Sequence, residues 1–122
     1  MRGISNTKFA AVILATVSTV SATAHHGLEG FDQTSLIELE GRVVGFELRD
    51  PHSVLFVEVE NPDGSRTAWE IEGGAARGIV EAGLSKEFLA SSPTVRITAF
   101  RSKDASCQPR CLAAGRDFDF DR

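Results

Sequence analysis

Histidines are the residues of this chain best suited to bind a metal ion, and two of the three, His25 and His26, are adjacent. They follow Ala22-Thr23-Ala24, whose small residues are typical of the site at which a signal peptide is cut. Cleavage after Ala24 would make His25 the first residue of the mature chain. Its free α-amine and its imidazole would then form a two-nitrogen chelate for a late first-row metal such as Cu(II).

The segment before this point has the features of an export signal. Residues 1–24 begin with the basic Arg2 and Lys8 and continue with an apolar run over 9–20. This run is shorter than the roughly 20 residues that span a bilayer, so we expect a cleaved signal, a periplasmic or secreted protein and no membrane insertion afterwards. Cleavage after Ala22 is the alternative, and it would place His25 third from the amine, which is also a Cu(II)-binding arrangement.

His52 is the third candidate ligand. It follows Pro51 at the start of a predicted strand, where an N-terminal arm could return to it. The alternative is that His25 and His26 are an unstructured terminus and that His52 is an ordinary surface histidine. Because the sequence has no methionine after Met1 and no tyrosine, it favours binding or delivery of copper over Met-rich Cu(I) handling or oxidative catalysis.

The two cysteines, Cys107 and Cys111, are separated by three residues. In an oxidising compartment, a pair with no other thiol available is expected to form a disulfide across this short loop. A redox-active pair and a copper–thiolate site are the alternatives. Both are less favoured, because the usual redox and zinc spacing is C-x-x-C and no second pair is present.

Hydrolytic chemistry has little support in the sequence. Ser53 and His52 are adjacent, so in a strand their side chains would point to opposite faces. Glu70 and Glu72 alternate along another predicted strand and would share a face, where paired carboxylates can do acid–base work. On an acidic surface, however, Glu70 and Glu72 are better interpreted as side chains on a solvent-facing side of the strand. We therefore expect a binding protein rather than an enzyme, and we assign no catalytic residue.

Charge and length limit the class of protein. Removing 24 of the 122 residues leaves 98, which suits one small domain. The removed segment holds two of the 13 basic residues and none of the 17 acidic ones, so the net charge changes from −4 to −6. Such a surface repels phosphates, which argues against nucleic acid and anionic membrane as partners. We expect a periplasmic protein or a small ligand instead.

Strands must position most of these residues. Alternating apolar and polar residues predict strands over 36–48, 54–60, 66–71, 93–100 and 112–120. Gly41 and Gly45 interrupt the first, where a bulge or bend would let it serve two sheets. Residues 75–82 are compatible with a short helix that Gly83 ends, and residues 85–89, capped by Ser85, could add one turn.

This order predicts an all-β domain with one short helix, an OB-fold-like, five-stranded, partly open barrel. An open antiparallel sheet with one helix across it is the alternative. The expected organisation is a signal peptide (1–24), an N-terminal arm (25–35) and the barrel domain (36–122). Trp69 is expected in the core or at the edge of the barrel groove, which makes Trp69, Glu70 and Glu72 candidates for contact with a ligand.

Three short motifs of the chain also resemble those of a known protein family. The chain has Ala24-His25-His26 at the expected mature start, Asp50-Pro51-His52 before the second strand, and the segment 69–74, which reads Trp-Glu-Ile-Glu-Gly-Gly. Over nearly the whole mature chain it resembles a family of small exported bacterial proteins known only as a domain of unknown function. It departs from that family's pattern in two ways. It has a cysteine pair, and it has an aspartate, Asp50, before Pro51 where the family has an asparagine.

The sequence thus predicts a small periplasmic protein that binds Cu(II) through His25, helped by His26 or His52. The alternative is a metal-free interaction module of OB-like fold that holds a protein, a glycan or a lipid in the barrel groove.

Overall fold

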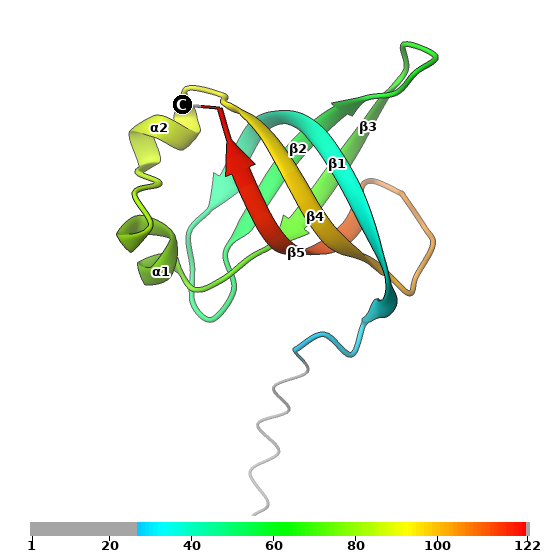
Figure 1. Ribbon diagram of the computed structural model, residues 1–122, viewed down its shortest axis with the longest axis horizontal. Coiled ribbons are helices and arrows are strands. Elements are labelled where there is room, and N and C mark those ends of the chain that lie inside the picture. Colours follow the sequence, from blue (N-terminus) through cyan, green and yellow to red (C-terminus); the bar gives the residue numbers. More distant parts are fainter. Residues whose placement is uncertain (1–26, 122) are drawn as a thin grey trace, which may run out of the picture.

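Five strands close into a barrel in the computed structural model of the protein, which describes residues 27–121 (Figure 1). The elements are β1 (Phe31–Glu47), β2 (Val54–Glu60), β3 (Arg66–Glu72), α1 (Ala76–Glu81), α2 (Lys86–Ala90), β4 (Thr94–Ser102) and β5 (Cys111–Phe120). The strands follow the order β1-β2-β3-β5-β4 around the barrel, and β4 pairs again with β1. Every pair is antiparallel except β3 with β5, which is parallel. The predicted five-stranded barrel is confirmed.

Two details of the predicted fold are wrong. The barrel is closed rather than partly open, because residues 69–72 of β3 pair with residues 111–114 of β5, and this pairing also excludes the open sheet. The described chain has two short helices instead of one. Gly83, with φ of +86°, ends α1, and the Ser85 hydroxyl then accepts a hydrogen bond from the Phe88 N–H at 3.1 Å and starts α2.

β1 is the strand that lets the barrel close. Its earlier part pairs with β4 and its later part with β2, and Arg42 pairs with both. The register shifts between Val43 and Gly45, so the predicted irregularity is a β-bulge. At Gly41 a Cβ would lie 2.4 Å from the backbone oxygen of Glu58. The two backbones can approach this closely only because position 41 has no side chain.

The start of β1 differs from the prediction, which placed residues 31–35 in an arm. The strand begins at Phe31, which pairs with Ser102 of β4, and the register then shifts before Leu36. In this segment Asp32 accepts hydrogen bonds from the N–H and the hydroxyl of Thr34. The four residues between Phe31 and Leu36 are all polar, so no alternation identifies this part of the sequence as a strand. Part of the expected arm therefore belongs to the barrel.

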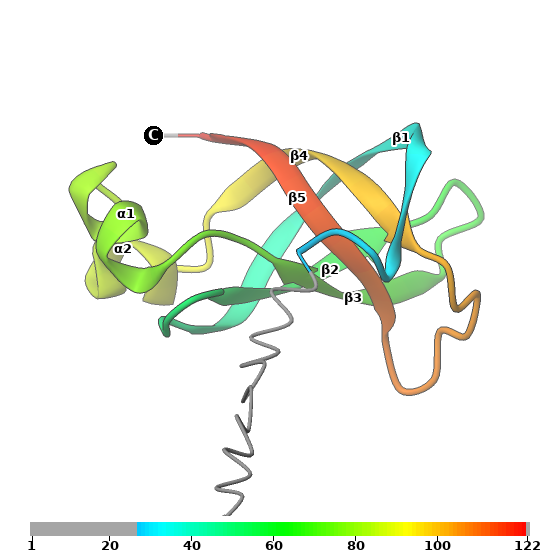
Figure 2. The same cartoon turned by 90° about the horizontal axis from the view of Figure 1, so that it is seen from below.

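The core lies inside the barrel and is continued by the helical end. Leu84 and Leu89, from the segment that contains α1 and α2, join the inward-facing strand residues. Figures 1 and 2 show both helices at one end of the barrel, while the loop between β4 and β5 lies at the other end. The strand residues of the core that are at most 1% exposed are Val43, Val57, Ile71, Val95, Ile97, Ala99 and Ala113. Within residues 27–121, no helix is long and apolar enough to cross a membrane.

Candidate functional site

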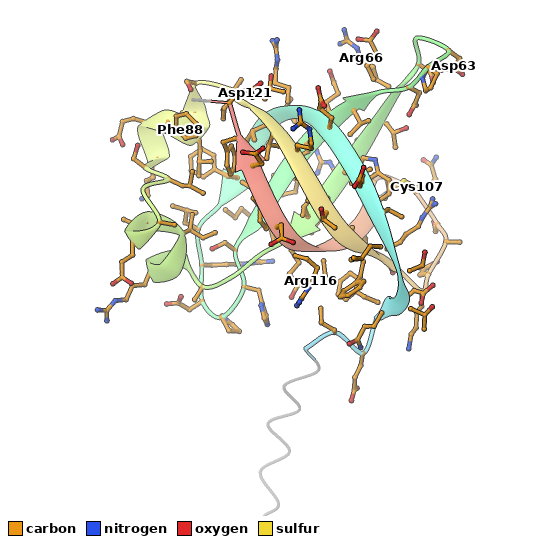
Figure 3. All side chains as sticks on the ribbon, in the orientation of Figure 1. Asp63, Arg66, Phe88, Cys107, Arg116 and Asp121 are labelled. Carbon is orange, nitrogen blue, oxygen red and sulfur yellow. A yellow bond between two sulfur atoms is a disulfide. The ribbon has the colours of Figure 1, made fainter. Side chains whose placement is uncertain are left out.

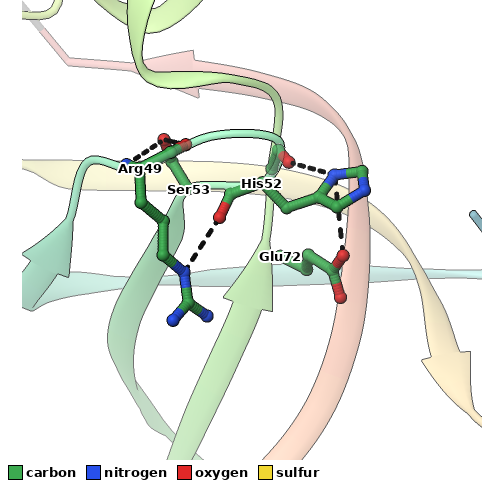
Figure 4. A network of polar contacts seen from close by, with 5 residues as sticks. Arg49, His52, Ser53 and Glu72 are labelled. Carbon is green, nitrogen blue, oxygen red and sulfur yellow. Dashed lines mark hydrogen bonds and ion pairs between the residues drawn. The ribbon is translucent and has the colours of Figure 1, made fainter. Parts of the chain in front are cut away.

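His52 lies in the connection between β1 and β2, against the end of β3. Its Nδ1 is 3.3 Å from the backbone oxygen of Gly73 and 3.6 Å from Oε1 of Glu72 (Figure 4). The side chains of His52 and Glu72 are 37% and 35% exposed. A histidine whose Nδ1–H donates to a carbonyl oxygen holds its lone pair on Nε2, the atom that coordinates metals in this tautomer. The ring is thus oriented as histidine ligands commonly are.

The connection that carries His52 is fixed to the end of β3. The Ser53 hydroxyl accepts a hydrogen bond from the Arg49 N–H and donates to the Arg49 carbonyl oxygen, each at 3.2 Å. Ser53 N–H donates to Gly74 O at 2.8 Å, and Gly73 N–H donates to Ser53 O at 2.7 Å. Ser53 is 2% exposed. Its hydroxyl therefore closes the loop.

Asp50 has a structural role beside this loop. Its Oδ1 accepts a hydrogen bond from the backbone N–H of Ala76 at 3.1 Å, at the first turn of α1. The peptide bond between Asp50 and Pro51 is cis. Asp50 therefore joins the His52 loop to the helical end of the barrel.

A pocket of about 270 Å³ lies beside His52. It is formed by four segments: the start of the described chain, the β1–β2 connection, the end of β3 with its following glycines, and β5. In Figure 2, which views the molecule from below, the start of the described chain crosses in front of β5. The residues that line the pocket are Gly27, Leu28, His52, Glu72, Gly73, Gly74, Ala114, Gly115 and Arg116.

The expected N-terminal ligands lie next to this pocket in sequence. His25 and His26, together with the signal peptide and its cleavage site, fall outside the described residues. Gly27, which directly follows His26, lines the pocket. Among residues 27–121, no group of three or more His, Cys, Asp or Glu side chains is arranged to hold a metal ion.

The groove candidates on β3 separate into two kinds. Trp69 is 6% exposed and belongs to the core, and the Arg101 guanidinium lies 5.6 Å from the centre of its ring. Glu70 and Glu72 are half-buried and flank the buried Ile71, so they share the outer face of the strand as expected. Of these candidates, Glu72 alone lines the pocket beside His52.

The two cysteines form the predicted disulfide, Cys107–Cys111. Cys111 begins β5 and pairs with Trp69 across the β3–β5 ladder. Because both sulfurs are bonded to each other, a copper–thiolate site is excluded in this state.

Sequence reasoning did not identify several pocket residues. Arg116 lines the pocket, and its guanidinium lies 5.5 Å from the centre of the Phe100 ring. Nothing in the local sequence pattern distinguishes this arginine from other surface arginines. In the sequence, Gly73 and Gly74 stand out only as the end of the motif over 69–74. Their carbonyl oxygens accept hydrogen bonds from the His52 loop, and only the tertiary pairing makes this visible.

Comparison with known proteins gives one match. Residues 12–110 match a family model described as a family of unknown function, DUF6152. The matched range includes β1 to β4 and both helices, and it ends directly before β5. No curated protein and no solved structure matches the chain.

Proposed function

The chain belongs to DUF6152, a family whose function is unknown, and we propose that it is a small exported protein that binds Cu(II) where its mature N-terminus meets the pocket of His52. In this proposal residues 1–24 are removed as a signal peptide and His25 becomes the first residue. We also assign the barrel to the OB-fold type, because its helices lie between β3 and β4 and its strand order returns from β4 to β1.

One observation carries the metal proposal: Gly27 lines the same pocket as His52 and Glu72. Consecutive Cα atoms are about 3.8 Å apart, so the Cα of His26 lies within about 4 Å of the Cα of Gly27, and that of His25 within about 8 Å. The covalent chain is therefore short enough for the proposal to use both imidazoles, and the amine created by cleavage, together with His52.

The donor set suits Cu(II). The α-amine and imidazole of His25 supply two nitrogens, and His52 supplies a third through Nε2. Nitrogen donors in a tetragonal arrangement are typical of Cu(II), which also binds them more tightly than other divalent first-row metals do. Glu72, 3.6 Å from His52 Nδ1, helps to orient the ring, as carboxylates beside metal-bound histidines do. We assign binding or delivery to this site rather than catalysis.

The experiment starts with the exported protein, purified without an affinity tag. Mass spectrometry establishes whether it begins at His25, and titration with Cu(II), followed by electron paramagnetic resonance, measures stoichiometry and the nitrogen donor set. We expect about one Cu(II) per chain, weaker binding in His52→Ala, and loss of the site in His25→Ala. Glu70→Gln is the matched control for Glu72→Gln, because both side chains lie on the outer face of β3.

Two results would overturn the proposal. One is a mature protein that does not bind Cu(II). The other is Cu(II) binding that persists with unchanged affinity when an additional residue precedes His25, since the terminal chelate would then be irrelevant. Cleavage after Ala22 would move the amine to Thr23, and the donor set seen by resonance would distinguish this variant of the site.

The metal-free alternative has less support from the geometry. Its expected contact residue, Trp69, is covered within the core. A partner that binds this barrel through an aromatic side chain would need a different residue.

A further inference from the structure

The two sulfurs of the Cys107–Cys111 disulfide differ in their accessibility. The disulfide lies at the end of the barrel opposite the helices (Figure 3). Cys111 is 3% exposed within β5, whereas Cys107 is half-buried in the preceding loop. A thiol that arrives from solvent therefore reaches Cys107 more readily than Cys111.

A cation lies beside the accessible sulfur. Nη2 of Arg101 is 3.8 Å from Sγ of Cys107, and the guanidinium is also stacked 5.6 Å from the centre of the Trp69 ring. The ring contact helps to hold the guanidinium in place. A fixed positive charge next to a cysteine favours its thiolate form, which is the form that takes part in exchange.

The loop around Cys107 is held by local contacts. Ser106 N–H donates to Oδ1 of Asp104, and Gln108 N–H donates to the Ser106 hydroxyl at the long distance of 3.4 Å. Exposed bonds of this kind cost little to break, so the loop can open while the barrel stays folded.

Cys111 also lies at one end of the shortest strand pairing in the barrel. The β3–β5 ladder consists of four pairs: Trp69 with Cys111, Glu70 with Leu112, Ile71 with Ala113, and Glu72 with Ala114. We call this ladder the seam. Its first pair contains Cys111 of the disulfide, and its last pair contains two residues that line the pocket beside His52. The seam therefore connects the disulfide to the pocket over about 10 Å of strand.

We propose that Cys107–Cys111 is an exchangeable disulfide that an exported dithiol protein reduces, and that its reduction loosens the seam and the pocket at the other end. The final part rests on the proposed metal function, while the exchange and the loosening do not. The oxidised protein would hold the pocket in its binding geometry, and the reduced protein would hold it less firmly.

The exchange balances as an ordinary two-electron transfer. A thiolate of the dithiol attacks Sγ of Cys107, a mixed disulfide forms, and the Sγ–Sγ bond breaks with its electron pair going to Cys111. The second thiolate of the dithiol then attacks its own partner sulfur and releases Cys107 as a thiolate beside Arg101. The dithiol becomes a disulfide, and its two protons end on the two cysteines or in solvent.

The first test measures the exchange equilibrium in a glutathione buffer. We expect Arg101→Gln to shift the protein toward the oxidised form by about threefold, which is what a partly exposed charge contact supplies. Arg96→Gln, which removes a positive charge from the same strand away from the sulfurs, is the control. Equal shifts in both variants, or no shift in either, would contradict the role of Arg101.

The second test measures hydrogen exchange at residues 111–114 and 69–72 in the oxidised and the reduced wild-type protein. We expect faster exchange in this seam after reduction and unchanged exchange in the β1–β4 ladder. No change in the seam would overturn the loosening, and faster exchange throughout the barrel would replace it with global destabilisation.

The third test connects the seam to the pocket. Cu(II) is the probe, and the variant is Cys107→Ala combined with Cys111→Ala, because neither this variant nor the oxidised wild type has a free thiol that Cu(II) could oxidise. We expect about tenfold weaker Cu(II) binding in the variant than in the oxidised wild type. Equal affinities would overturn the coupling. If neither protein binds Cu(II) while the seam still loosens on reduction, the metal site is wrong and the exchangeable disulfide is supported.

Discussion

Replacing Gly41 with alanine should destabilise the barrel more than the same change at Gly45 or Gly74. The new Cβ would lie 2.4 Å from the Glu58 backbone oxygen and 2.8 Å from Cγ1 of Val57. Contacts this short do not occur, and because the nearest atom is backbone, the two strands have to move apart. The strain falls at the point where Arg42 pairs with both β2 and β4.

The size of the effect follows from two opposing contributions. Overpacking costs about 1–3 kcal/mol, and a contact with paired backbone places Gly41→Ala near the upper end. Replacing glycine in a strand recovers about 0.5–1 kcal/mol, because the unfolded chain loses freedom. The net loss is about 2 kcal/mol, which lowers the Tm of a domain of this size by about 8–16 °C.

Thermal and urea unfolding, followed by circular dichroism, measure this loss. Gly74→Ala is the matched control, since a Cβ there would meet no atom within 4 Å. Gly45→Ala should fall between the two, because its Cβ would lie 3.2 Å from the Phe56 side chain, which can adjust. If Gly41→Ala and Gly74→Ala unfold at the same temperature, close backbone contact is not what closes this barrel.

Three further outcomes are expected. Glu72→Gln should weaken Cu(II) binding about tenfold, because a neutral amide orients and polarises the neighbouring imidazole less than a carboxylate does; unchanged affinity in a titration would remove Glu72 from the site. Hydrogen bonds from the Ser65 hydroxyl and N–H lower the pKa of Asp63. The stability that this carboxylate gives to the β2–β3 turn is therefore present above the ordinary aspartate pKa and is lost as pH falls through the lowered value. An NMR titration that gives an ordinary or raised pKa for Asp63 would be inconsistent with this. Ser53→Ala should cost about 1 kcal/mol in urea unfolding and also weaken Cu(II) binding, because it removes both bonds that close the loop; a loss of stability without any change in binding would separate the loop from the site.

Much of the fold could be predicted because most strands are exposed on one face. Alternation identified β2, β3, β4 and β5 to within two residues. It could not identify the start of β1, because the four residues between Phe31 and Leu36 are all polar. Closure could not be predicted either, since residues 69–72 meet residues 111–114 across about forty positions with no local signal.

The candidate site could also be predicted only in part. The chemistry of His52 was evident from its residue type, but its hydrogen-bond acceptor, Gly73 O, is 21 residues away and is determined by the packing of the β1–β2 connection on β3. Glu72 was selected for a different reason, its alternation with Glu70. The structure brings Glu72 to the histidine and leaves Glu70 outside the pocket.

Closure of the barrel also limits how another protein can recognise this one. Each of the five strands has a hydrogen-bonded neighbour on both sides. A partner peptide therefore finds no full-length open edge on which to dock as an additional strand, a common way of binding β-sheets. A delivery partner would have to recognise side chains and loops, and the pocket where the chain enters the barrel is the place where both come together.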